Sequence, residues 1–191
     1  MSLRFVAAVL IGRLAAIVCR CFGRGGTAFP GLVAEFICPD FVSQSANRLL
    51  SDAILITGTN GKTTTTRVLA AMFEEAGISV VYNREGSNLM RGIGAALLAS
   101  IPTTQIFGNL HKTVALMEVD EAVLPHAANA LKPRAIVFTN LFRDQLDRYG
   151  ELEHVMALWH RTINNLSANT VLILNADDPS IAELASAHVG P

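Results

Sequence analysis

A short run of glycine, lysine and threonine residues, TGTNGKTTTT at positions 57–66, has the composition of a phosphate-binding loop. A lysine beside a hydroxyl residue suits this chemistry, because the ammonium group neutralises phosphate oxygens while the hydroxyl oxygen coordinates Mg²⁺. The usual pattern places one glycine five residues before the glycine that precedes the lysine. Ile56 stands there, and the nearest earlier glycine is Gly58, three residues before Gly61. The loop is therefore a shortened form of the common motif.

The stretches on either side of this loop alternate between short apolar runs and amphipathic segments. Strands are predicted over 53–57, 78–82, 113–119, 135–139 and 170–174, and helices over 61–76, 89–100, 121–131, 151–165 and 179–187. In the first of these helices, Leu69, Met72, Phe73 and Ala76 are expected on one face, and Gly77 is expected to end it. This alternation predicts an α/β fold, a mainly parallel sheet with helices on both faces.

The predicted order of elements places the loop where such folds bind ligands, at the carboxyl end of a strand. A helix that begins near Gly61 presents free backbone N–H groups and a positive dipole end there. Gly58 and Gly61 would let the backbone approach phosphate oxygens, Lys62 would reach the β- and γ-phosphates, and Thr63 would hold Mg²⁺. The alternative is an ordinary strand-to-helix turn with a surface lysine.

The composition restricts the classes of function. With 191 residues, 51% hydrophobic and 16% charged, the chain can form one good core. A net charge of −1 argues against a nucleic-acid-binding surface. Three cysteines, Cys19, Cys21 and Cys38, do not make a disulfide framework and fit a reducing compartment. No fourth ligand accompanies them, so buried or idle thiols are favoured over a metal site.

The first residues are predicted to form a helix with Arg13 and Arg20 on one face and apolar residues around the rest. No apolar run there approaches the roughly 18 residues that span a bilayer. Packing of this helix on the domain is favoured, and the alternative is a helix resting on an anionic membrane surface. A glycine-rich stretch with Pro30, residues 23–31, is expected to act as a connector. Residues 1–50 are accordingly assigned to the N-terminal helix and connector, and residues 51–191 to the domain that carries the loop.

The shortened loop resembles that of the Mur ligase and folylpolyglutamate synthase superfamily, whose members activate a carboxylate with ATP and join an amine to it. Five further segments resemble the MurT-type family in particular: 25–39, 83–93, 116–122, 139–153 and 174–179. The resemblance implies that residues 51–191 form a P-loop-type Mur ligase central domain that uses ATP and Mg²⁺.

The resemblance also assigns roles to individual residues. Lys62 and Thr63 match the phosphate-binding lysine and the magnesium-binding hydroxyl, and Glu118 matches the acidic magnesium ligand. Asn88 stands where related ligases have an asparagine near the terminal phosphate. The alternatives are an ordinary strand-end carboxylate at Glu118 and a turn residue at Asn88. The nucleotide-binding candidates are Gly58, Thr59, Asn60, Gly61, Lys62, Thr63, Thr64 and Asn88, with Lys62 and Glu118 as catalytic and Thr63 and Glu118 as metal-binding residues.

Two departures separate the chain from amino-acid-adding Mur ligases. Those enzymes have D-H-x-D where residues 144–147 are DQLD, so Gln145 replaces a histidine that helps to hold a second metal. They also often use a carbamylated lysine shortly afterwards, and no lysine follows Lys132. Both departures favour the MurT-type family. Arg91 and Arg143 are further candidates for anion contacts, although solvated arginines are the commoner outcome.

The resemblance implies a carbon–nitrogen ligase in peptidoglycan biosynthesis. It would amidate the D-glutamate of lipid II with ammonia from a GatD-type glutaminase, in the cytoplasm or at the inner face of the membrane. It also implies a zinc ribbon and a C-terminal domain after Pro191, so zinc is expected only there. The alternatives are an amino-acid-adding Mur ligase, a folylpolyglutamate synthase-like ligase, and a nucleotide-dependent switch without ligation.

Overall fold

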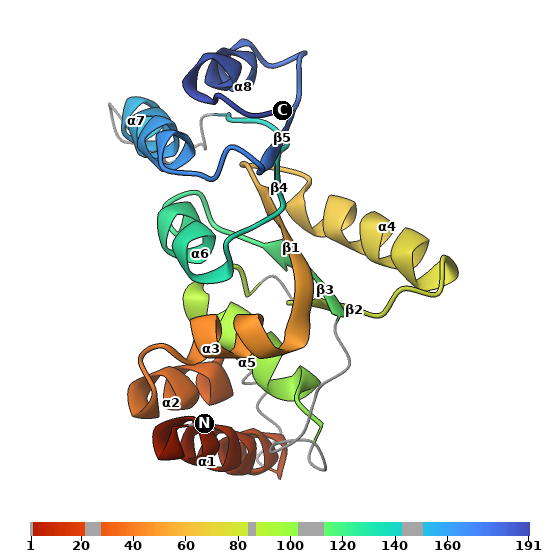
Figure 1. Cartoon of the computed structure of the whole chain (residues 1–191), viewed down its shortest axis with the longest axis vertical. Helices are drawn as coiled ribbons and strands as arrows, with labels where there is room; N and C mark the ends of the chain where they lie inside the picture. The colour runs from red at the N-terminus through yellow and green to blue at the C-terminus, as the bar shows by residue number, and fades with distance from the viewer. Residues whose placement is uncertain (1, 22–27, 84–86, 103–112, 143–150) are drawn as a thin grey trace.

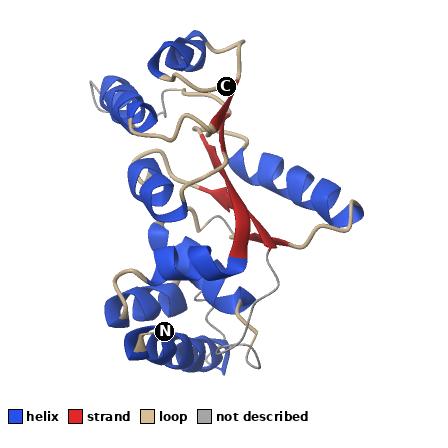
Figure 2. Ribbon diagram, viewed as in Figure 1, coloured by secondary structure: helices blue, strands red, loops and turns tan. Residues whose placement is uncertain are grey.

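The computed structural model describes residues 2–21, 28–83, 87–102, 113–142 and 151–191. Its strands are β1 (Leu50–Thr57), β2 (Val80–Tyr82), β3 (Thr113–Glu118), β4 (Ala135–Phe138) and β5 (Val171–Leu174). They form one five-stranded sheet in the order β2-β3-β1-β4-β5, and every neighbouring pair is parallel. Figure 2 shows this sheet with helices around it. The predicted α/β class and the parallel sheet are confirmed.

The two faces of the sheet are covered unequally (Figure 1). The helices are α1 (Leu3–Cys21), α2 (Phe29–Ile37), α3 (Phe41–Leu49), α4 (Lys62–Glu75), α5 (Met90–Ser100), α6 (Leu124–Leu131), α7 (Glu151–Asn164) and α8 (Pro179–Glu183), with a 3₁₀ turn at Leu184–Ala187. Helix α4 lies on one side of the sheet, and the other helices gather on the opposite side and at the ends. The prediction of helices on both faces is therefore confirmed.

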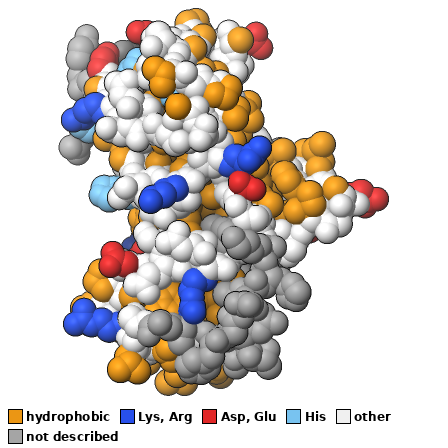
Figure 3. Space-filling view, viewed as in Figure 1, with side chains coloured by type: hydrophobic (Ala, Val, Ile, Leu, Met, Phe, Trp, Pro, Cys, Tyr) orange, Lys and Arg blue, Asp and Glu red, His pale blue; other side chains and the backbone are white. Residues whose placement is uncertain are grey.

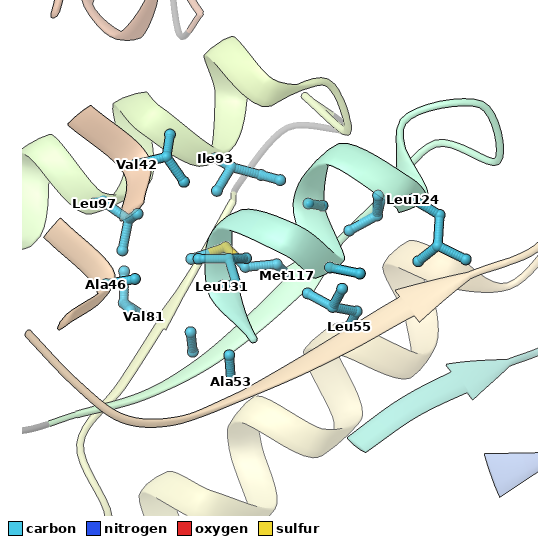
Figure 4. Close-up of a cluster of buried hydrophobic side chains, with 14 of the residues drawn as sticks. Val42, Ala46, Ala53, Leu55, Val81, Ile93, Leu97, Met117, Leu124 and Leu131 are labelled. Carbon is cyan, nitrogen blue, oxygen red and sulfur yellow. The ribbon is translucent and has the colours of Figure 1, made fainter. Parts of the chain in front are cut away.

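The larger core lies between the sheet and the helices α3, α5 and α6 (Figure 4). Its fully buried members include Leu55 of β1, Met117 of β3, Leu97 of α5 and Leu124 of α6. Phe5 of α1 belongs to the same continuous cluster. The N-terminal helix therefore packs on the domain, as the sequence favoured, and residues before β1 share its core.

The smaller core lies under α4, where Ile56 and Leu116 of the sheet are buried against Ala70. Leu69 and Phe73 pack there as predicted. The other two residues of that predicted apolar face are not buried: Met72 is 63% exposed, and Ala76 is also exposed. Helix α4 packs mainly on β1, β2 and β3, and the flank that carries these two residues faces solvent. Gly77 has a φ of 74° and ends the helix as expected.

The predicted connector partly overlaps a helix that the sequence did not suggest. Phe29, Pro30 and Gly31 form the first turn of α2, and residues 22–27 lie outside the described residues. Pro30 is compatible with a helix there, because the first N–H groups of a helix have no intrahelical partner. A Cβ at Gly31 would collide with the backbone of Arg91. The missing side chain therefore lets α2 pack closely on α5.

Candidate functional site

The loop between β1 and α4 uses its two glycines for different purposes. Gly61 has a φ of +85°, and a Cβ built on it would meet nothing within 4 Å. Gly58 has a φ of +128°, and a Cβ there would collide with the Thr139 hydroxyl and the Asn140 backbone. Gly61 thus leaves open space at the start of α4, whereas Gly58 permits close packing on the segment after β4. Gly58 was expected only to let the backbone approach phosphate, and the structure adds a second role, close packing against Thr139 and Asn140.

The segment after β4 fixes the first half of the loop. The backbone N–H of Asn60 donates to Asn140 Oδ1 at 2.9 Å, and Asn140 Nδ2 and Thr139 Oγ1 both donate to the Asn60 carbonyl, at 3.0 and 2.8 Å. The N–H of Thr59 donates to the Asn140 carbonyl at 3.0 Å, and its hydroxyl accepts the Phe142 N–H at 3.0 Å. Thr59 and Asn60 therefore already have partners for their N–H groups.

The N-terminus of α4 remains available to an anion. The first intrahelical bond runs from the N–H of Thr65 to the carbonyl of Gly61, and no side chain caps the helix at Gly61. The N–H groups just before Thr65 are those that a helix leaves without internal acceptors. Together with the helix dipole, they make the positions from Gly61 to Thr64 suitable for phosphate oxygens. Thr64 is exposed on this first turn.

Thr63 and Glu118 meet at the carboxyl edge of the sheet. The Thr63 hydroxyl lies 2.8 and 3.0 Å from the two carboxylate oxygens of Glu118, and it donates its hydrogen to that group. Glu118 is the last residue of β3 and is 4% exposed. A hydroxyl and a carboxylate oxygen in contact are the hard ligands that Mg²⁺ prefers. The two residues predicted to hold the metal are thus adjacent, and their chemistry fits it.

Asn83 holds Glu118 in place and was not singled out from the sequence. Its Oδ1 accepts the Glu118 N–H at 2.8 Å, and its Nδ2 donates to the carbonyls of Glu118 at 2.7 Å and Ser87 at 2.8 Å. The Asn83 side chain is buried, and its amide bonds both the backbone N–H and the backbone carbonyl of Glu118. The available signal was a polar residue directly after the predicted strand 78–82.

Lys62 is held by a carboxylate that the sequence analysis also missed. Its Nζ lies 3.1 Å from Glu121 Oε1 and donates to the carbonyls of Gly58 and Thr59. The side chains of Lys62 and Glu121 are 11% and 20% exposed, so the pair is largely shielded. The Glu121 carbonyl in turn accepts from Trp159 Nε1 at 3.1 Å. The site thus has two carboxylates, Glu121 against Lys62 and Glu118 against Thr63, for one ammonium group, and this balance favours an added cation.

The other candidates are placed as follows. Asn88 is half-buried, and its carbonyl accepts the Asp120 N–H at 3.0 Å, which brings it beside the end of β3. Arg91 is exposed on α5. The candidates Arg143 and Gln145 lie outside the described residues, with the rest of the DQLD motif.

The cysteines lie away from this loop. Cys19 is half-buried, Cys21 exposed and Cys38 buried, and all three are free thiols. Burial raises the pKa of Cys38, and the nearby Asp40 backbone and Arg4 oppose that rise. No group of three metal-ligating side chains occurs among the described residues. A cavity of about 1090 Å³ also lies away from the loop, near the amino ends of β1, β4 and β5, where Ala53, Arg134 and Thr170 line it.

Comparison with known proteins identifies the family. Residues 56–189 match the Mur ligase middle domain. Over 178 residues the chain is 35% identical to the MurT subunit of lipid II isoglutaminyl synthase from Staphylococcus aureus (strain COL), covering 93% of this chain and 38% of that protein. The Streptococcus pneumoniae MurT subunit is 34% identical over 179 residues, with 94% and 38% covered. The chain thus spans about 38% of the length of these relatives.

Solved structures show the same fold at lower identity. MurF from Acinetobacter baumannii superposes with a TM-score of 0.62 and 19% identity, covering 83% of this chain and 33% of that one. The Thermotoga maritima MurF ligase in complex with ADP gives 0.64 and 16%, covering 81% and 35%. With the match over residues 56–189, these likenesses lead to one conclusion: the chain belongs to the Mur ligase family and carries its middle domain.

Proposed function

We propose that the protein is the ATP-dependent ligase subunit of a lipid II isoglutaminyl synthase in peptidoglycan biosynthesis. The observation that carries the proposal is the convergence of Lys62, Thr63 and Glu118 at the N-terminus of α4. The 35% identity with the staphylococcal MurT subunit supports this choice among ligases. The ADP bound to the Thermotoga MurF ligase supports a nucleotide as the ligand of the same fold.

Each residue of the site has a separate task in this proposal. The N–H groups from Gly61 to Thr64 bind phosphate oxygens, and Lys62 exchanges its contact with Glu121 for the β- and γ-phosphates. Thr63 and Glu118 hold Mg²⁺, which neutralises negative charge on the phosphates. Asn83 positions the Glu118 backbone, and Asn88 lies close enough to the end of β3 to face the same ligand.

The proposed reaction has two steps. The carboxylate of D-glutamate attacks the γ-phosphorus of ATP, which forms an acyl phosphate and releases ADP. Ammonia then attacks the carbonyl carbon, the C–O bond to phosphate breaks, and one proton is lost from nitrogen. Lys62 stabilises the charge on the phosphoryl group during transfer, because a preorganised cation in a partly shielded site acts strongly there.

Ammonia is proposed to come from a separate GatD-type glutaminase. A glutaminase needs an activated nucleophile, usually a cysteine thiolate paired with histidine. Cys38 does not meet this requirement, since burial raises its pKa instead of lowering it. Cys19 and Cys21 lie on α1, and no histidine precedes His111 in the sequence. Because lipid II stays in the bilayer, the reaction would take place at the inner face of the membrane.

An amino-acid-adding ligase is the second candidate, and one finding favours it. The UDP-N-acetylmuramoylalanine–D-glutamate ligase of Bdellovibrio bacteriovorus is 33% identical over 141 residues, 74% of this chain and 28% of that enzyme. Its nucleophile would be an amino acid instead of ammonia. Gln145 in the DQLD motif and the lack of a lysine after Lys132 count against this candidate.

The experiment compares nitrogen sources. The protein encoded by the complete gene is supplied with ATP, Mg²⁺ and lipid II, and with ammonium, glutamine or amino acids in turn. ADP release and product mass are measured. We expect amidation with high ammonium, and with glutamine only after a glutaminase subunit is added. Lipid II that is already amidated is the control and should release no ADP.

Three results would contradict parts of this proposal. Incorporation of an amino acid would support the amino-acid-adding ligase. Efficient use of glutamine by the protein alone would remove the glutaminase partner. ATP hydrolysis that does not depend on a carboxylate substrate would favour a nucleotide-dependent switch.

A further inference from the structure

Helix α1 has two apolar faces, and the domain covers one of them. Phe5, Ala8, Val9 and Gly12 are buried against the rest of the chain. The exposed large apolar side chains of the same helix are Leu3, Leu10, Ile11, Leu14, Ile17 and Val18. Because a helix turns about 100° per residue, Leu3, Leu10, Leu14 and Ile17 form one stripe, opposite the buried face. A helix that only packed on the domain would carry polar residues along this stripe.

The neighbouring helix continues this pattern. Phe29, Leu32 and Phe36 of α2 are exposed at a spacing that places them on one face, and Phe36 is 89% exposed. Helices α1 and α2 pack against each other. In Figure 3, hydrophobic and basic side chains both appear at the lower end of the molecule, where Figure 1 places these helices. We call the exposed residues Leu3, Leu10, Ile11, Leu14, Ile17, Val18, Phe29, Leu32 and Phe36 the α1–α2 apolar surface.

The charges around this surface point to its occupant. Arg4 flanks the α1 stripe on one side, and Arg13 and Arg20 flank it on the other, as the helical spacing requires. Helix α1 has no acidic residue, and the sequence has none before Glu35. A stripe of leucine and isoleucine with arginines on both sides is typical of helices that lie in the headgroup region of an anionic bilayer. The arginine stems can extend along apolar surface while their guanidinium groups contact lipid phosphates.

We infer that the α1–α2 apolar surface docks on an anionic lipid bilayer, with α1 lying in the plane of the interface. None of the helices in the described ranges has the length and apolar character needed to cross a bilayer, so this contact is peripheral. The inference deepens the proposed function, because a lipid-linked substrate is reached from a membrane surface. Its physical basis, an apolar face flanked by arginines, does not depend on that function.

The experiment measures sedimentation with lipid vesicles. The protein is mixed with vesicles of phosphatidylcholine alone or of phosphatidylcholine with phosphatidylglycerol. The variant Leu10→Ser/Leu14→Ser/Ile17→Ser removes the centre of the stripe. The matched control Val68→Ser/Met72→Ser removes two exposed apolar side chains from α4, which lies on the other side of the sheet. All five side chains are exposed, so both variants should fold, and circular dichroism checks this.

We expect the unmodified protein and the control to sediment with phosphatidylglycerol vesicles. The triple variant should partition at least about 100-fold less, because three large side chains lose their transfer from water. Binding should weaken on phosphatidylcholine alone and in high salt, since headgroup attraction is screened. Arg4→Gln/Arg20→Gln should lower binding to the anionic vesicles more than binding to the neutral ones.

Two outcomes would overturn the inference. The first is equal sedimentation of the triple variant and the unmodified protein, or no sedimentation of either. The second is a dimer that the triple substitution dissociates in the absence of vesicle binding, which would make the surface an interface between two copies. ADP release with a water-soluble D-glutamate-containing substrate is measured in parallel. If the triple variant keeps this activity but loses vesicle binding, docking is separated from catalysis.

Discussion

Two regions of the molecule differ in whether their side chains have partners within the chain. At the carboxyl edge of the sheet, the functional polar groups already have partners: Thr63 contacts Glu118, and Lys62 contacts Glu121. On the α1–α2 apolar surface, large side chains such as Leu14 remain 59% exposed. One region pairs its functional polar side chains with each other, and the other leaves its apolar side chains in water.

This contrast separates two kinds of function. Paired polar groups in a shielded site are held in a defined geometry, so they suit the chemistry of a charged ligand. Exposed apolar groups gain free energy only when a partner removes them from water. Substitutions at the sheet edge should therefore change catalysis or folding stability. Substitutions on the α1–α2 apolar surface should change association and leave folding stability nearly unchanged.

The largest expected effect is the loss of ATP turnover in Lys62→Ala. Removal of a preorganised charge from a phosphoryl-transfer site should lower the rate by about 10²–10³-fold. The fold should remain intact, because the lysine contacts carbonyls of its own loop and one carboxylate. Steady-state turnover and thermal unfolding are measured side by side. Arg67→Ala, an exposed change on the same helix, is the control, and near-normal turnover in folded Lys62→Ala would remove the loop from the mechanism.

The two loop glycines should differ in their effect on folding stability. Gly58→Ala should destabilise by about 3 kcal/mol or more, since its Cβ collides with Thr139 and Asn140 in addition to the cost of a positive φ. Gly61→Ala meets no neighbour and should cost only about 1–2 kcal/mol from its φ of +85°. Urea unfolding measures both. Equal costs would mean that the loop does not depend on packing against the segment after β4.

Asn83→Ala tests whether the sheet edge needs its internal pairing. The change leaves the buried Glu118 N–H and carbonyl without their side-chain partners, which should cost about 2 kcal/mol of folding stability. It should also weaken Mg²⁺-dependent nucleotide binding, because Glu118 loses its fixed position. Asn165→Ala is a suitable control, since that amide, just after the end of α7, donates to the Arg161 carbonyl in an exposed contact. Unfolding and nucleotide titrations are compared, and a loss of stability equal to the control would contradict the positioning role.

The sequence predicted the parts of the molecule that depend on local pattern. The strands and the helix after the loop follow from runs of apolar residues. The choice of Thr63 and Glu118 came from the family resemblance, and the structure places their side chains in contact. Helix α2 was partly taken for a connector because glycine and proline usually break helices. Its glycine instead serves a close helix crossing, and its proline stands at the helix start.

The missed site residues depend on tertiary structure. Asn83 reaches Glu118 because β2 and β3 are neighbours in the sheet, and strand order is not readable from one sequence. Glu121 lies in a turn after β3 and contacts Lys62. The backbone carbonyl of Glu121 accepts a hydrogen bond from Trp159 of α7, a helix far away in the sequence. The sequence favoured packing of α1 on the domain, but it did not show that one face of the helix stays exposed. An apolar helix has the same sequence pattern whether one or both of its faces are covered.

Glu118→Gln should have a smaller effect, confined to the metal. Replacement of one carboxylate oxygen by an amide weakens a hard cation ligand, so the Mg²⁺ concentration for half-maximal turnover should rise by roughly tenfold. The Thr63 contact can persist through the remaining carbonyl oxygen, and the fold should be retained. Arg67→Ala, an exposed change further along the same helix, is the control. An unchanged Mg²⁺ requirement would mean that the metal lies elsewhere at this edge.

The smallest expected effect concerns Glu35, the acidic residue of α2. It tests whether the charged form of this half-buried carboxylate lowers the folding stability. Burial raises the pKa of Glu35, so the folded state binds its proton more tightly than the unfolded state. The charged carboxylate therefore lowers stability above its folded pKa, and this cost disappears as the pH falls below the unfolded value. Glu35→Gln should raise stability at pH 7 by roughly 0.5 kcal/mol or less, and the gain should vanish near pH 4. Urea unfolding across this pH range measures it, with exposed Glu74→Gln on α4 as the control. A gain that persisted unchanged at low pH would assign the effect to packing instead of charge.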